Sequence, residues 1–251
     1  MIGTSTLSFF GQDLREILEI LSKDFRFIEI IDEGEVLSKS LSDTLESFKL
    51  SLSVHAPFSD LNIASFNERI RRESLNQLKE CLEISSHLQA KVVTLHPGRF
   101  SPQSLNYPKK VFEVHLASFK ELSKYAEEFS LALGLENMPS YQFDFLLMKE
   151  PFEICEMLEA VSSECLKFTL DIGHANINAD PFRFFSLEEE IAVIHLHDNH
   201  GESDEHIALG DGSINSEGML KWLREFKNEM IIETYSYEDA LKTRKILERY
   251  S

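Results

Sequence analysis

Six short apolar segments of this sequence end in, or close to, a histidine, an aspartate or a glutamate. These residues are His55, His96, Glu136, Asp171, His195 and Glu233. Imidazole and carboxylate groups together are ligands for Zn, Mn, Fe or Co, whereas Mg and Ca favour oxygen ligands alone. Burying so many acids and imidazoles in one site would carry a large desolvation cost, which bound cations would offset. The residue types therefore predict a divalent-metal site.

Three more residues of the same types follow in loop-like sequence. His174 comes three residues after Asp171, and Asp204 and His206 form an Asp-x-His pair. In an extended segment, residues two apart point to the same side, so this pair would offer two ligands together. The turn sequence 210–212, Gly-Asp-Gly, then leads the chain into the next helix. The predicted ligand set thus contains nine residues.

The elements that must position these residues are strands that alternate with helices. Eight segments rich in β-branched, aliphatic or aromatic residues predict strands: Thr4–Phe9, Phe27–Ile30, Leu52–His55, Val92–His96, Leu131–Glu136, Phe168–Asp171, Val193–His197 and Met230–Glu233. Helical periodicity between them is the pattern of a parallel sheet. Eight such units in 251 residues fit one closed barrel, which takes about 250 residues. We expect the α/β class: a single (β/α)8 TIM barrel domain over residues 1–251, with the site at the C-terminal ends of its strands.

The composition limits the classes of partner. Lys and Arg total 25 and Asp and Glu total 43, a formal net charge of −18, which repels phosphate backbones and anionic membranes at long range. Duplex DNA is therefore disfavoured as a substrate but not excluded, since a local basic patch could bind it. No apolar stretch approaches the ~18 residues that span a bilayer, so we expect no membrane partner. Three cysteines without metal-binding spacing, and an N-terminal segment unlike a signal peptide, predict a cytoplasmic protein.

Short motifs at the predicted strand ends occur in the order found in a known superfamily. They are His55-Ala56-Pro57, His96-Pro97-Gly98, Glu136-Asn137, Asp171-Ile172-Gly173-His174, His195-Leu196-His197-Asp198, Asp204-Glu205-His206 and Glu233-Thr234. In this order the chain resembles the xylose isomerase-like TIM barrel superfamily, which holds endonuclease IV and many sugar and sugar-phosphate isomerases and epimerases. The resemblance covers nearly the whole chain and is clearest from Ser53 to Thr234.

The resemblance implies a role for each predicted ligand. Four residues match the metal shell that the superfamily shares: Glu136, Asp171, His195 and Glu233. Two histidines, together with the first of those glutamates, match the ligands of a second metal in endonuclease IV: His55 and His96. Three residues match the ligands of its third metal: His174, Asp204 and His206. The cofactor that the resemblance implies is therefore a divalent metal, Zn or Mn, with one to three ions per chain.

The first function that the resemblance offers is a sugar or sugar-phosphate isomerase or epimerase. One divalent ion would hold two neighbouring oxygens of a hydroxy-carbonyl sugar and stabilise the enediolate as a Lewis acid. Glu136 and Glu233 would be catalytic, one removing the proton next to the carbonyl and the other returning it. The acidic composition suits a small-molecule sugar as substrate. This chemistry, however, needs only the four shared ligands and leaves the other five without a necessary task.

The alternative is a zinc-dependent phosphoester hydrolase of endonuclease IV type. Two or three zinc ions would bind the phosphate oxygens, generate hydroxide and stabilise the leaving oxygen, which uses all nine ligands. Few cations lie near the predicted barrel mouth, namely Arg99, Lys109, Lys110 and Arg183, so a small phosphoester fits better than DNA. A third interpretation, a metal-bound module without catalysis, would instead require a closed coordination shell with no position for water.

Three further residues are candidates for substrate binding. Arg99 follows the motif that contains His96, Glu29 ends the second predicted strand, and His197 lies two residues after His195 on the same face of its strand. For Glu29 and His197 a structural role, as hydrogen-bonded groups that orient ligands, is an equal alternative. The sequence predicts neither the particular substrate nor the oligomeric state.

Overall fold

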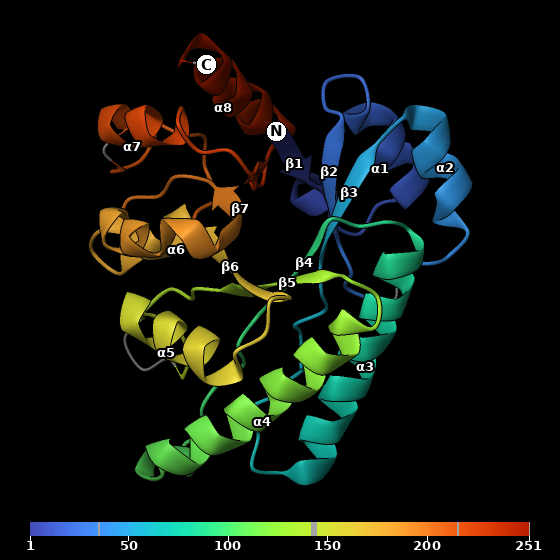
Figure 1. Cartoon of the computed structure of the whole chain (residues 1–251). Helices are drawn as coiled ribbons and strands as arrows, with labels where there is room; N and C mark the ends of the chain where they lie inside the picture. Colours follow the sequence, from blue (N-terminus) through green and yellow to red (C-terminus); the bar gives the residue numbers. More distant parts are fainter. Residues whose placement is uncertain (35, 142–144, 215, 251) are drawn as a thin grey trace.

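In a computed structural model the eight strands close into one parallel barrel, with the helices packed around it (Figure 1). The structure describes residues 1–34, 36–141, 145–214 and 216–250. The strands are β1 (Ile2–Ser5), β2 (Phe27–Ile31), β3 (Ser51–His55), β4 (Val92–Leu95), β5 (Ala132–Glu136), β6 (Leu166–Asp171), β7 (Ile191–Leu196) and β8 (Glu229–Ile232). The barrel closes where β1 pairs with β8, with Gly3 opposite Ile231. The expected (β/α)8 TIM barrel is confirmed.

A ring of helices covers the outer face of the barrel. They are α1 (Leu14–Leu21), α2 (Leu41–Phe48), α3 (Glu68–His87), α4 (Pro108–Glu127), α5 (Pro151–Val161), α6 (Ile172–Ile177), α7 (Ser216–Leu223) and α8 (Tyr237–Tyr250). The two longest, α3 and α4, pack against each other beside β4 (Figure 1). In α3 the buried residues Leu75, Leu78 and Leu82 recur at helical spacing and form its inward face. In the described residues no helix combines the length and the apolarity that crossing a bilayer requires.

The first strand is shorter than the expected Thr4–Phe9. β1 ends at Ser5, and the next four residues form a 3-10 turn, η1 (Thr6–Phe9). The Ser5 side chain accepts a hydrogen bond from the backbone N–H of Leu7, and the Thr6 hydroxyl accepts one from that of Ile31. These side-chain bonds compete with the sheet ladder and turn the chain out of the strand.

The barrel interior is layered, because alternate residues of each strand point inward. Its floor is an apolar cluster of Phe27, Val92, Val193 and Ile231. Above the floor lies a fully buried polar layer with Glu29, Ser53, Thr94, Thr169 and His195. Glycine at position 134 leaves room for the Thr169 side chain in this layer, since a Cβ there would lie 2.0 Å from Oγ1 of Thr169. The inward positions above this layer are the strand ends, where the predicted ligands fall.

Candidate metal centre

The residues expected as metal ligands gather at the C-terminal mouth of the barrel. His55, Glu136 and Asp171 are the last residues of their strands, and His96 and Glu233 directly follow theirs. The others lie in β7, in α6 and in the loop after β7: His195, His174, Asp204 and His206. His96 and Asp204 are partly exposed, and the remaining seven are at most 7% exposed. The mouth therefore holds a mostly buried collection of acids and imidazoles.

The first cluster of ligand atoms joins Glu136 to two histidines. Its Oε2 lies 3.3 Å from Nε2 of His55 and 3.1 Å from Nε2 of His96. The two imidazole rings meet edge to face with centroids 4.8 Å apart, and Phe58 stacks on His96 at 4.5 Å. The aromatic packing thus holds both nitrogens on the same carboxylate oxygen, in a group of three that could bind one cation.

The central cluster is organised around Nδ1 of His195. This nitrogen lies 3.3 Å from Oε1 of Glu136 and 3.4 Å from Oε2 of Glu233. Oδ2 of Asp171 lies 4.0 Å from it. On the opposite edge of the ring, Nε2 of His195 lies 3.0 Å from Oε1 of the fully buried Glu29. Three carboxylates thus face one edge of this imidazole and a fourth holds the other edge.

The third cluster is built on Asp204, from the loop after β7. Its Oδ2 lies 3.2 Å from Nε2 of His174 and 3.0 Å from Nε2 of His206. His206 has a backbone φ of 47°, which few non-glycine residues adopt and which is typical of functional sites. The loop is fixed by Asp198, whose buried carboxylate accepts hydrogen bonds from the backbone of Gly210 and Ile214.

His197 lies between the central and third clusters. Its Nε2 is 3.1 Å from Oδ1 of Asp171 and 3.5 Å from Oδ1 of Asp204. Its ring stacks on His206 at a centroid distance of 3.8 Å, and a Cβ on Gly173 would lie 1.9 Å from its Cε1. The missing side chain of Gly173 is therefore what admits this imidazole. The fully buried His197 thus lies between the carboxylates of Asp171 and Asp204.

Three of the histidines make a second contact, through Nδ1, that would leave Nε2 free to bind a metal. Nδ1 lies 2.9 Å from a backbone carbonyl oxygen in each: His55 with Ala56, His174 with Asn137, and His206 with Glu233. A ring that donates its Nδ1 proton to a carbonyl presents an unprotonated Nε2 to the site. His197 differs, because its Nδ1 has no hydrogen-bond partner in the described chain. This difference favours His197 as a positioning residue that donates from Nε2.

The donor set fits a divalent cation. Buried oxygens of Asp171 and Asp204 have no hydrogen-bond partner among the described residues, although each lies beside imidazole nitrogens. A tetrahedral zinc ion with ligands at 2.0–2.1 Å separates those ligands by about 3.3 Å. The nitrogen–oxygen distances of 3.0–3.3 Å in the first and third clusters are close to that ligand–ligand separation. Four groups of three or four such ligand atoms each lie within 4.8 Å of one another.

The acids and imidazoles shift one another's pKa values. Burial alone would raise the pKa of Glu136, but His96, His195 and His55 outweigh it and hold that pKa well below its usual value. Burial opposes protonation of His55 and His206, yet their carboxylate neighbours raise each pKa to about 9. At Glu233 burial dominates and raises the pKa of the carboxyl. Protons and metal ions compete for these atoms, so metal binding there would release protons.

A cavity of about 310 Å³ opens over the ligands. Seven of the nine predicted ligands line it, all except Asp171 and His195, together with Phe58, Met138, Tyr141 and Tyr235. No sequence motif marks these four as site residues. None of them is a histidine, aspartate or glutamate, and only the folded loops bring them to the mouth. Arg99 lies at the rim of a neighbouring cavity. The expectation that Glu29 ends its strand is wrong. It lies two residues before the end of β2, under His195 and outside the cavity lining.

Comparison with known proteins decides the family. A family model described as "Xylose isomerase-like TIM barrel" matches residues 16–250. The chain belongs to the xylose isomerase-like TIM barrel family. An uncharacterized protein of Methanocaldococcus jannaschii is 34% identical to this member, over 99% of the chain and 88% of the relative. A solved structure of a D-tagatose 3-epimerase-like protein is 32% identical, covers 99% of this chain and 96% of that one, and superposes with a TM-score of 0.89.

Two more distant relatives of this family member carry named activities. A fructoselysine 3-epimerase of Shigella flexneri is 24% identical over 75% of the chain and 70% of the relative. A probable endonuclease 4 of Aquifex aeolicus is 29% identical over 73% of the chain and 69% of the relative. Both functions that the sequence resemblance offers are thus represented among the relatives.

Proposed function

We propose that this protein is a divalent-metal-dependent sugar isomerase or epimerase that moves a proton with Glu136 and Glu233. One observation carries the proposal: the two carboxylates, from the ends of non-neighbouring strands, lie 3.3 and 3.4 Å from the same nitrogen of His195. They therefore face one small volume from different sides of the barrel. A hydroxy-carbonyl carbon in that volume would have one carboxylate to remove its proton and another to return it.

Four residues would hold the metal for this chemistry: Glu136, Asp171, His195 and Glu233. When bound, a Zn or Mn ion supplies Lewis-acid polarisation of the hydroxy-carbonyl group. The chain's own contribution is orientation: the Glu29 carboxylate faces Nε2 of His195 at 3.0 Å, and Asn137 holds Asp171 by two hydrogen bonds. The Asn137 side chain donates to the backbone oxygen of Asp171 at 2.9 Å and accepts from its N–H at 2.8 Å. Such outer contacts hold ligands in a productive geometry.

The relatives and the cavity support a small sugar as the substrate. The D-tagatose 3-epimerase-like structure shares the barrel over almost its whole length, and fructoselysine 3-epimerase is a relative with a named sugar reaction. The cavity over the ligands holds about ten water volumes at ~30 Å³ each. A six-carbon ketose, with twelve heavy atoms, is of that size. The three thiols are all free, which supports a reducing cytoplasmic setting for the enzyme.

The second candidate is a zinc phosphoester hydrolase, and the three clusters favour it. With Glu136 shared by two of them, the nine predicted ligands form the three groups expected for a trinuclear site: His55–His96–Glu136, Glu136–Asp171–His195–Glu233, and His174–Asp204–His206. The charges at the mouth argue against duplex DNA as its substrate. Among the described residues that line the two cavities there, Arg99 is the one Lys or Arg. Neutralising a run of phosphates requires more cations than that.

Metal content and turnover separate the two candidates. The chain, prepared without chelator or histidine tag, would be analysed for metal, alongside Glu136→Ala and a His55→Ala/His96→Ala double variant. We expect the epimerase to lose its essential ion in Glu136→Ala, and the double variant to retain turnover of ketoses. Three zinc ions per chain, phosphodiester cleavage by the native protein and no ketose turnover would establish the hydrolase instead. A protein that binds no metal after reconstitution would contradict both.

A further inference from the structure

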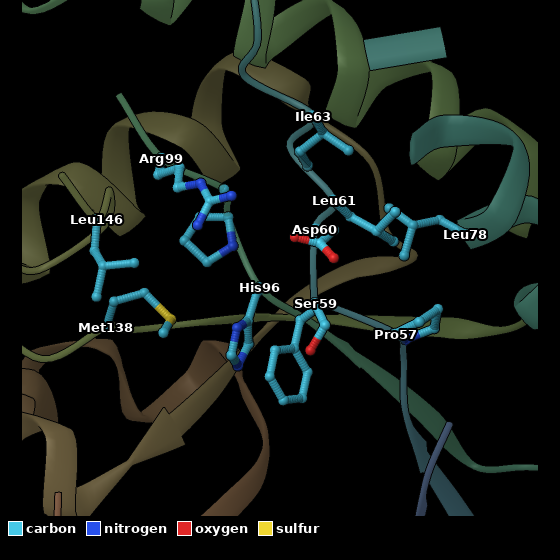
Figure 2. A pocket seen from close by; sticks show the side chains of 13 residues that line it. Pro57, Ser59, Asp60, Leu61, Ile63, Leu78, His96, Arg99, Met138 and Leu146 are labelled. Atoms are coloured by element: carbon cyan, nitrogen blue, oxygen red, sulfur yellow. The ribbon is translucent and has the colours of Figure 1, made fainter. Parts of the chain in front are cut away.

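A second cavity, of about 470 Å³, adjoins the one over the metal ligands (Figure 2). The loops after β3 and β4 and the segment after β5 form it. Phe58, His96, Met138 and Leu146 line both cavities, so the two adjoin at these side chains. The first cavity, of about 310 Å³, is the space proposed above for a six-carbon ketose. The second is therefore space for a substituent that extends from the sugar past His96.

The second cavity is lined by both apolar and polar side chains, among them two charged groups of opposite sign. Figure 2 shows Met138 and Leu146 on one side of His96 and Leu61 and Leu78 on the other, with Asp60 and Arg99 drawn between these walls. Both charged side chains are exposed. Within the described chain neither forms an ion pair. An anion and a cation of a ligand could therefore each find a counter-charge here.

The loops that carry the two charges are tied together. The Asn62 side chain donates to the backbone oxygen of Arg99 at 3.0 Å and accepts from the Arg99 N–H at 3.2 Å. Gly98, with a φ of +90°, permits this contact, since a Cβ there would lie 2.8 Å from Oδ1 of Asn62. Arg99 also forms an antiparallel bridge with Leu146. The cavity is thus built on a fixed framework, which lowers the ordering cost of binding.

We propose that the second cavity binds the substituent of a sugar conjugate: an aliphatic tether that ends in a zwitterionic amino-acid group. The tether packs between Leu61 and Met138, the terminal carboxylate pairs with Arg99, and the terminal ammonium pairs with Asp60. Arg recognises a carboxylate through paired N–H donors, which gives direction to the end group. This inference rests on the proposed sugar chemistry of the adjoining metal centre, and it names the substrate class: a ketose linked through an aliphatic chain to an amino acid.

Four ketose probes isolate the contribution of each charge. Fructoselysine carries both end charges. Fructosyl conjugates of 6-aminohexanoate and of 1,5-diaminopentane carry only the carboxylate and only the ammonium, and free fructose carries neither. We would compare kcat/KM of the metal-loaded enzyme for each. We expect Arg99→Met to lower kcat/KM about three- to tenfold for the two carboxylate probes alone. Asp60→Asn should lower it similarly for the two ammonium probes alone, and Asn tolerates the φ of +60° at this position.

Matched controls and a binding measurement keep the test independent of turnover. Arg15→Met and Asp43→Asn remove the same charges from exposed positions on α1 and α2, and should leave all four probes unchanged. If no ketose is converted, the proposed function fails. Calorimetric binding of free lysine to the metal-loaded protein then still tests the cavity, with binding expected in the native chain and weakened in both variants. Equal effects of Arg99→Met on charged and uncharged probes, or lysine binding unaffected by either variant, would overturn the proposal.

Discussion

The carboxylate of Glu29 lies 3.0 Å from Nε2 of His195, and both side chains are completely buried. The other nitrogen of the same ring faces Glu136 and Glu233. A carboxylate behind a ligand histidine fixes its tautomer and orientation and raises its basicity. We therefore propose Glu29 as a positioning residue, one layer beneath the candidate metal centre in the barrel interior.

The first prediction concerns this pair. Glu29→Gln keeps the size of the side chain but removes its charge, and we expect metal affinity to fall about 10- to 100-fold. Competition with a chelator would measure it. Ser53→Ala serves as the matched control, because Ser53 also donates to Glu29, at 2.9 Å, without touching His195. An unchanged metal affinity in Glu29→Gln would show that the carboxylate does not act through His195.

The second prediction assigns the proton transfers. Glu233→Gln and Glu136→Gln should each lower kcat by about 10²–10⁴, the usual contribution of a general acid or base. Solvent deuterium distinguishes the two steps: a variant that has lost only the returning acid still exchanges the substrate proton while it forms no product. Metal content is measured in parallel, because both residues are also proposed ligands. Full kcat in either variant would remove that glutamate from the chemistry.

The third prediction tests the packing that admits His197. A Cβ at Gly173 would lie 1.9 Å from Cε1 of His197, so Gly173→Ala should lower the free energy of unfolding by about 1–3 kcal/mol through overpacking. His197→Ala removes the obstacle. In the double variant Gly173→Ala/His197→Ala the alanine at 173 should therefore cost much less, and chemical denaturation of the four proteins gives the coupling energy. Additive effects would mean that the two positions do not contact each other in solution.

The sequence predicts the barrel and the ligand set because both depend on local patterns. Strands that alternate with helices specify the parallel barrel, and a barrel brings the residues at its strand ends to one mouth. The sequence does not determine the position of Glu29, because the residue at which β2 ends decides whether Glu29 faces the cavity or lies beneath it. The pattern likewise does not predict the short helix α6, whose first turn follows directly on Asp171.

The cavity itself depends on loop geometry that no local pattern specifies. Asp60 and Arg99 are 39 residues apart; the pairing of β3 with β4 and the contact of Asn62 with the Arg99 backbone bring their loops together. Phe58 and Tyr235 have no periodic neighbours that would mark them as lining residues. His115 shows the same limit: it belongs to the inward face of a long helix, and its sequence position gives no hint that it contacts Pro97, beside a proposed metal ligand.

The last prediction uses that buried histidine to test the pH dependence of stability. Burial lowers the pKa of His115 to about 3, only partly offset by its hydrogen bond to the backbone of Pro97. Between about pH 6.5 and pH 3 the unfolded chain therefore binds a proton at this residue that the folded chain does not. Stability from this residue is complete above pH 6.5 and is lost as the pH falls, by at most about 1.4 kcal/mol per pH unit.

His115→Gln should lose less stability on acidification. Since the metal-site residues titrate in both proteins, the difference between their denaturation midpoints from pH 7 to pH 5 isolates His115. Parallel pH profiles would show that the imidazole is protonated in the fold.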